Sequence, residues 1–172
     1  MKRIFAIAAL AVAALLVSAS AALAVTNFAN APSGAHYRSG FGEPVCTTSG
    51  TTTLTVSCTG TQIGGVGNTN AELDLAVTAT ANFVCHNPGN DNIVEPHSGS
   101  VSEETSATLA PSRNGTLVVD AKSVSLTPQE AGAQFTCPNP KWREEFVGFS
   151  NPSFTYSLTF AGFDQPAILI TG

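Results

Sequence analysis

The sequence predicts an all-β protein, an antiparallel immunoglobulin-like β-sandwich of about 7–9 short strands that follows a helical signal peptide. One observation is the stretch 71–85, AELDLAVTATANFVC, in which every odd position is apolar and most even positions are polar. Strand side chains alternate between the two faces of a sheet, so this pattern indicates one buried face and one wet face. The other observation is that turn residues recur at near-regular spacing, and no amphipathic helix follows the leader.

The start of the chain has the pattern of a targeting segment. Lys2 and Arg3 precede an uncharged apolar run, and Ala22-Leu23-Ala24 matches the small-x-small cleavage rule. The apolar run is shorter than the ~20 residues that a membrane helix needs. We therefore expect a signal peptide at 1–24, an extended lead-in at 25–44 and a disulfide-linked sandwich domain at 45–172. The expected product is secreted, extracellular and not attached to a membrane.

Composition narrows the classes of partner. The chain has 12 acidic and 7 basic residues, and two of the basic residues lie in the leader. Nucleic acid and anionic lipid both select clustered basic side chains, so neither is expected as a partner. No motif calls for a cofactor, and none is expected.

The four cysteines are typical of an oxidising compartment. Three pairings are possible; we expect Cys46–Cys58 and Cys85–Cys137, and the other two stay open. Zinc is disfavoured because no two cysteines have the short spacing of a structural site. If Cys85 and Cys137 are bonded, their strands should end at the same pole of the domain, in facing sheets, as in an immunoglobulin-like domain. Trp142 follows the second cysteine instead of lying between the two, which excludes an antibody-type domain.

Further elements follow from alternation and punctuation. Loops are expected at 87–92 and at Asn114-Gly115, and one helical turn is expected from Pro128. The polar stretch 98–106 is not assigned to a strand. The strands expected besides the long one are 51–58 with a continuation at 61–63, 107–110, 117–121, 133–137, 145–149, 154–160 and 167–171, with an edge strand near 36–41.

Several motifs occur in a fixed order: Cys46…Cys58, Gly65-Val66-Gly67-Asn68, Cys85-His86-Asn87-Pro88-Gly89-Asn90, Asn114-Gly115 and Cys137-Pro138-Asn139-Pro140-Lys141-Trp142. In this order the chain resembles a family of small secreted bacterial proteins without an assigned activity. The resemblance covers roughly residues 46–160. It implies secretion and an all-β fold, and it implies no catalytic residue.

Candidate chemistry is sparse. Glu95 and His97, with Asp91 nearby, could bind a metal, but a solvated loop is favoured, and no metal site is expected. No Gly-x-Ser-x-Gly motif occurs. The glutamate doublets 103–104 and 144–145 would point to opposite faces of a strand and are expected to be surface residues. We therefore expect a protein that is not an enzyme.

An aromatic cluster gives the most specific functional hypothesis. Trp142 and Phe146, with Phe149 nearby, could form a platform for sugar stacking, although aromatic residues mostly fill cores. The first hypothesis is a secreted binding or structural protein, envelope-associated or adhesive, whose partner is an unknown protein or glycan at the cell exterior. The alternative is a carbohydrate-binding module that uses Trp142. Self-association through an edge strand is also expected, with 167–170 as the candidate edge.

Overall fold

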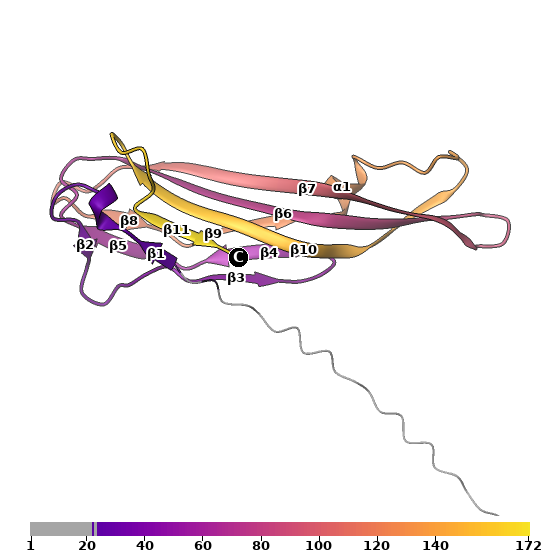
Figure 1. Ribbon diagram of the computed structural model, residues 1–172, viewed down its shortest axis with the longest axis horizontal. Helices are drawn as coiled ribbons and strands as arrows, with labels where there is room; N and C mark the ends of the chain where they lie inside the picture. Colours follow the sequence, from indigo (N-terminus) through magenta and orange to yellow (C-terminus); the bar gives the residue numbers. More distant parts are fainter. Residues whose placement is uncertain (1–21, 23) are drawn as a thin grey trace, which may run out of the picture.

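The computed structural model describes Ala22 and residues 24–172, and this part of the chain forms an elongated all-β structure (Figure 1). Most of the expected signal peptide lies outside the described residues. The all-β, antiparallel, sandwich-like prediction is confirmed. The described residues contain eleven strands, more than expected, because several very short strands complete the sheets. The elements are β1 (Ala24–Thr26), η1 (Phe28–Asn30), β2 (His36–Tyr37), β3 (Cys46–Ser49), β4 (Leu54–Cys58), β5 (Thr61–Gly64), β6 (Ala71–His86), β7 (Ile93–Leu109), β8 (Leu117–Val119), β9 (Lys122–Leu126), α1 (Pro128–Gly132), β10 (Arg143–Phe160) and β11 (Ile168–Thr171).

The central strand is β6. It lies in a five-stranded sheet of order β1-β11-β10-β6-β7, paired with β7 on one side and β10 on the other. All eight of its odd-numbered side chains, from Ala71 to Cys85, are at most 3% exposed, as the alternation predicts. Burying one leucine or valine of this kind contributes roughly 1.5–3 kcal/mol, so the row supplies much of the driving force for folding.

The second layer consists of two three-stranded sheets, β2-β5-β8 and β3-β4-β9. Their inward side chains, among them Val56, Ile63 and Leu117, join the buried row of β6 in one hydrophobic cluster. The expected continuation at 61–63 is a separate strand, β5, in a different sheet from β4. Cys46 and Cys58 lie opposite each other on β3 and β4 and form the expected disulfide, with the two Cα atoms 4.0 Å apart.

The polar stretch 98–106, left unassigned above, is the middle of the 17-residue strand β7. The expected short strand at 107–110 is the end of the same element. Alternation is hidden here because β7 is an edge strand with few buried contacts: among its side chains only Val101 is fully buried. The loop expected at 87–92 is confirmed as the turn of the β6–β7 hairpin.

The two strands expected at 145–149 and 154–160 are one strand, β10. The Ser-Asn-Pro punctuation between them is a β-bulge, in which Asn151 has φ +50° and the register with β6 shifts between Ser150 and Ser153. Turn residues can interrupt a ladder locally without ending the strand, because a bulge absorbs the extra residue.

The segment 133–137 is not a strand, which corrects the expectation from its alternation. It continues from α1 with local hydrogen bonds, from Gln134 N to Ala131 O and from Phe135 N to Gly132 O. Cys137 bonds to Cys85 as expected, but from an irregular segment and not from a strand of the facing sheet. The two cysteines therefore do not end parallel strands at one pole, the feature on which the immunoglobulin-like comparison depended.

The ends of the described chain are joined in the large sheet. β11 lies between β1 and β10, so the expected free edge at 167–170 is wrong: it is covered by β1, which joins Ala24, the last residue of the predicted signal peptide, to the start of the predicted lead-in. The expected edge strand near 36–41 is present as β2, and the expected helical turn from Pro128 is present as α1. No helix among the described residues is long and apolar enough to span a membrane.

We predict that the two disulfides differ in their contribution to stability. Replacing Cys85 and Cys137 by serine should lower the free energy of unfolding by about 4 kcal/mol, and replacing Cys46 and Cys58 by about 3 kcal/mol, because the first bond closes the longer loop. The sequence separations are 52 and 12 residues. Urea unfolding of the two double variants measures both values; a larger loss for the Cys46–Cys58 pair would contradict the prediction.

A second prediction concerns Tyr156, which is 1% exposed and whose hydroxyl has no hydrogen-bond partner in the described structure. Burial, and then the nearby Tyr37, raises the pKa of its phenol above the ordinary 10.0. The folded state thus holds the phenol protonated, so stability is complete below about pH 10 and falls at higher pH by up to about 1.4 kcal/mol per pH unit. Tyr156→Phe should reduce this alkaline loss and, because it removes an unpaired buried hydroxyl, raise the neutral-pH free energy of unfolding by about 1 kcal/mol.

Urea unfolding of wild type and Tyr156→Phe across neutral and alkaline pH gives the comparison. Burial also raises the pKa of Tyr37, so part of the alkaline loss should remain in the variant. Equal alkaline losses in the two proteins would show that the Tyr156 hydroxyl reaches solvent or a partner.

Candidate functional site

The candidate site is the end of the molecule at which β6, β7 and β10 extend beyond the second layer (Figure 1). We call this end the distal tip: the β6–β7 turn 87–92, the segment 137–142 and the adjoining ends of the three strands. Its position follows from strand length, since β6, β7 and β10 have 16, 17 and 18 residues, whereas the strands of the second layer have at most five.

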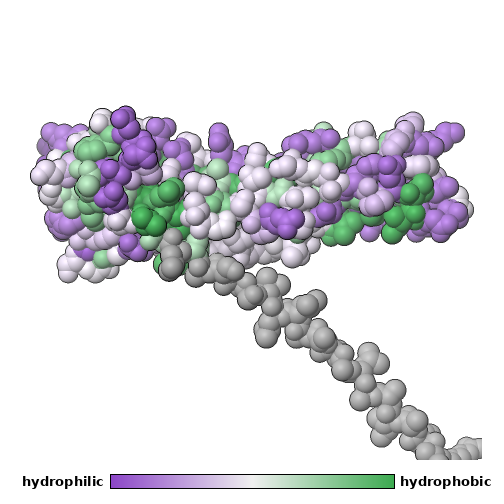
Figure 2. Space-filling view, viewed as in Figure 1, coloured by the Kyte–Doolittle hydropathy of each residue, from purple (hydrophilic) through white to green (hydrophobic). Residues whose placement is uncertain are grey.

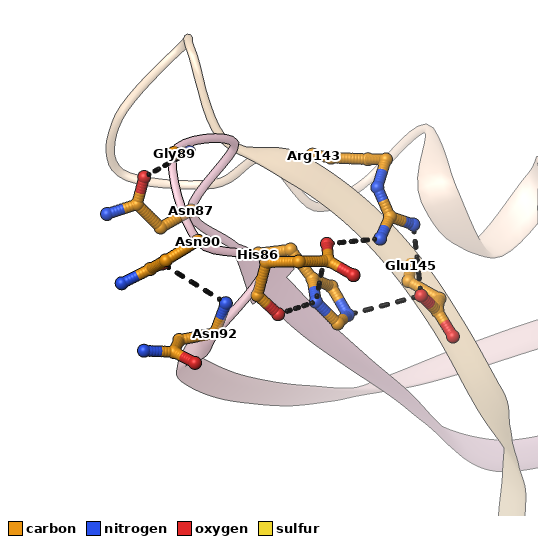
Figure 3. A network of polar contacts seen from close by, with 8 residues as sticks. His86, Asn87, Gly89, Asn90, Asn92, Arg143 and Glu145 are labelled. Atoms are coloured by element: carbon orange, nitrogen blue, oxygen red, sulfur yellow. Dashed lines mark hydrogen bonds and ion pairs between the residues drawn. The ribbon is translucent and has the colours of Figure 1, made fainter.

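The β6–β7 turn is held by its own asparagine side chains (Figure 3). Asn87 Oδ1 accepts a hydrogen bond from Gly89 N at 2.9 Å, and Asn90 Oδ1 accepts one from Asn92 N at 3.2 Å. Asp91 adopts φ +53°, a left-handed conformation that Asp tolerates better than most residues. Short side chains that bond their own backbone give the turn a defined shape.

A polar network joins this turn to the two long strands beside it (Figure 3). Arg143 donates to Asp91 Oδ1 at 2.9 Å and to Glu145 Oε2 at 3.0 Å. His86 lies between the same two carboxylates: its Nδ1 is 3.1 Å from the Asp91 carbonyl oxygen, and its Nε2 is 3.1 Å from Glu145 Oε2. The latter contact lacks hydrogen-bond geometry, so we treat it as an electrostatic contact.

The network fixes its own charges. The hydrogen bonds that Arg143 donates to Asp91, and then to Glu145, raise the pKa of its guanidinium, so Arg143 remains charged. The side chain of His86 is only 11% exposed, whereas that of Arg143 is 55% exposed. The network therefore presents one accessible cation, Arg143, and the two carboxylates to which it is bonded. These charged groups lie against the buried imidazole of His86.

The other face of the tip is covered by α1 and the segment 133–137. A capping box starts α1: Thr127 and Glu130 bond each other's backbone N–H groups. Beyond the helix, the Phe135 ring lies 4.9 Å from that of Phe83, next to the Cys85–Cys137 disulfide. The disulfide and this ring contact together hold the covering segment against the sheet.

Trp142 and Phe146, the two residues predicted to form an aromatic platform, make no ring contact with each other. Phe146 packs edge-on against Phe83 and Phe149, with ring centroids 5.2 and 4.9 Å apart, so its ring belongs to the hydrophobic cluster under α1. Trp142 is half-buried immediately before β10, and its backbone N donates to Asn139 O at 3.0 Å. No ring pair in the described structure includes Trp142, and its sugar-binding role stays a prediction.

The tip also carries three aliphatic side chains that the sequence analysis did not single out. Ile93 and Val147 are each 62% exposed, and Val94 is 44% exposed. We call these three residues the tip patch. Figure 2 shows hydrophobic residues gathered among hydrophilic ones at this end of the molecule. The sequence could have indicated two of them. Ile93 and Val94 directly follow a polar turn, and adjacent exposed aliphatic residues at such a place can mark a binding surface.

Other predicted site residues lie as follows. His97 Nε2 is 3.9 Å from Glu95 Oε2, while Asp91 points into the network instead of toward this pair. Within the described residues, no group of three or more His, Cys, Asp or Glu side chains could hold a metal ion. The pairing of Arg143 with Glu145 was missed, although their two-residue spacing in a strand places them on one face.

No protein-family model, no curated protein sequence and no solved structure matches this chain. The resemblance to small secreted bacterial proteins therefore stays a prediction, and the function has to be argued from the molecule.

We predict that Gly99 and Phe135 are coupled, because a Cβ on Gly99 would overlap the Phe135 ring. Gly99→Ala should lower the free energy of unfolding by about 1–3 kcal/mol through overpacking. In a Phe135→Ala background the same change should be neutral or stabilising by about 0.5 kcal/mol, because alanine restricts the unfolded chain and Gly99 has no positive φ. A double-mutant cycle by urea unfolding checks the sign change; an equal loss in both backgrounds would mean that the segment 133–137 does not lie on the sheet.

Proposed function

We propose that the protein is a secreted, non-catalytic binding protein that engages a protein partner through the distal tip. The observation that carries the proposal is that the tip patch and the Asp91–Arg143–Glu145 charges are both exposed at one end of the molecule, which is held by a disulfide. A binding surface typically combines an apolar centre with a polar, charged rim, and exposed aliphatic clusters on soluble proteins often mark such surfaces.

Two features support the extracellular part of the proposal. All four cysteines are paired in disulfides, which persist in oxidising compartments. The leader sequence, with Lys2, Arg3 and the apolar run after them, supports export across a membrane. The long strands β6, β7 and β10 then place the tip beyond the end of the second layer.

The chemistry of the tip favours a protein over a glycan. Sugars are bound chiefly by stacking on flat aromatic rings and by directed hydrogen bonds, whereas Ile93, Val94 and Val147 offer branched aliphatic surface. The network beside them offers one cation and two carboxylates already bonded to each other. A partner with an apolar patch bordered by charged side chains would be complementary to this arrangement.

We predict that the triple variant Ile93→Thr, Val94→Thr, Val147→Thr loses the partner. Threonine keeps the β-branched shape but removes apolar surface, so affinity should fall by at least about tenfold. The matched control is Val25→Thr with Val118→Thr, two exposed valines on β1 and β8 at 67% and 47% exposure. Immobilised wild type, triple variant and control are exposed to the medium of the organism of origin, and the retained protein is then purified and titrated directly.

Each outcome decides the proposal. A purified partner that binds wild type and control alike, but not the triple variant, supports it. Equal titration curves for wild type and the triple variant place the binding surface elsewhere. Retention of nothing by wild type contradicts the proposal, and in that case a polysaccharide pull-down with wild type and Trp142→Ala tests the carbohydrate-binding alternative.

A further inference from the structure

We infer that two copies of this chain pair through β7, antiparallel and about a two-fold axis at Ser100, joining their five-stranded sheets into one continuous sheet. This inference goes beyond the proposed function, and it is centred on the middle of β7, outside the distal tip. It rests on the unpaired side of β7, the direction of its backbone groups and the positions of its charges.

Among the described residues, the outer side of β7 has no strand paired with it. β7 is the last strand of the five-stranded sheet, and in the described part of the chain no backbone hydrogen bond joins it to any segment except β6. Figure 1 shows no further strand beyond it along that side. Its register with β6 is unbroken from Glu95 to Leu109, so no bulge turns this long edge away from an approaching strand.

Pro96 identifies the backbone groups that point outward. Proline has no N–H, and inside a sheet it occupies positions where that bond would face away from the neighbouring strand. Pro96 lies opposite Val84 in the ladder with β6. Backbone groups alternate sides along a strand, so the other even-numbered residues, Ser98 to Thr108, also direct their N–H and C=O groups outward. All of their side chains are exposed.

This alternation restricts how a second copy can pair. Outward groups can bond only outward groups, so even-numbered residues must lie opposite even-numbered residues, and the two-fold axis passes through one residue. A closed, self-complementary interface of this kind is the commonest form of homodimer.

Charge restricts the register. β7 has no lysine or arginine, and its acidic side chains are Glu95, Glu103 and Glu104. An axis at residue 99, 103 or 104 would place two glutamates directly opposite each other, which is destabilising. Other axes avoid this, but only the axis at Ser100 places Glu103 opposite His97 of the second copy.

His97 and Glu103 supply a complementary contact in this register. The side chain of His97 is 28% exposed. In the Ser100-centred register, the carboxylate of Glu103 from the second copy lies on the same face as this imidazole and directly across from it. The two-fold axis makes the contact twice. The Pro96 positions, which lack a donor, lie opposite Glu104, four residues from the axis on either side, so the hydrogen bonds nearest the axis remain intact.

The first experiment measures association of the full mature protein by sedimentation velocity from micromolar to millimolar concentration. Wild type should show a concentration-dependent dimer. Ser100→Pro removes the outward N–H at the axis while the ladder to β6 stays intact, and should raise the dissociation constant at least about tenfold. Ser100→Ala keeps the N–H and should dimerise like wild type. Ser100→Lys, which places like charges opposite each other, gives the same test should the proline variant fail to fold.

The second experiment fixes the register by cross-linking. Opposite residues of a hydrogen-bonded antiparallel pair have Cα atoms about 5.5 Å apart, within the range that a disulfide spans. Ser100→Cys should therefore form an intermolecular disulfide, whereas Ser102→Cys, exposed on the same row, should not, because its two copies lie about four residues out of register.

Non-reducing electrophoresis after mild oxidation reports the cross-linked dimer. A wild type that stays monomeric at every concentration overturns the inference. Cross-linking of Ser102→Cys in preference to Ser100→Cys overturns the register. Val147→Thr changes a tip-patch residue on β10 and leaves β7 unaltered, so it should dimerise like wild type; failure of the tip proposal and failure of this inference are therefore distinguishable.

Discussion

The buried row of β6 is the constraint on which the rest of the structure depends. A strand whose odd side chains are all apolar over so many residues can exist in water only if something covers that face along its whole length. The second layer covers the half nearest β2 and β5, with Ile63 and Leu117 among the contacts. The strands of that layer are short, so the other half of β6 needs a separate cover.

That cover is α1 with the segment 133–137. This cover has too few residues to bury a core by itself, and two contacts attach it to β6. Phe135 packs on Phe83, and Cys137 is bonded to Cys85, the next residue of the same buried row. The same arrangement leaves the opposite face of the tip free for the His86–Arg143 network. A structural requirement, the covering of β6, thus produces an end of the molecule with one closed face and one exposed, charged face.

The two edges of the large sheet differ in how far they are covered. On one side, the short strand β1 covers β11, so that edge is nearly closed. On the other side, β7 follows β6 through a tight hairpin and is as long as its neighbour, but no later segment of the described chain pairs with it. Its Ser- and Thr-rich exposed row keeps this open edge soluble, and the outward N–H and C=O groups are what the proposed pairing uses.

Local pattern alone accounts for the all-β class, the long strand over 71–85, the turn at 87–92 and the helical turn from Pro128, and it favoured the two disulfides over the other pairings. Alternation and turn chemistry indicate these features because they depend on residues close in sequence. The cysteines were tractable because four of them allow only three pairings. The tertiary structure decided which side of each strand is paired, and this explains three of the corrections. β7 reads as polar because its partner lies on one side only; 133–137 alternates but packs on a sheet instead of joining one; and 167–170 is enclosed because a distant segment reaches it. The tip network likewise joins residues far apart in sequence, such as Asp91 and Arg143, which are 52 positions apart, because antiparallel pairing brings the end of one strand beside the start of another.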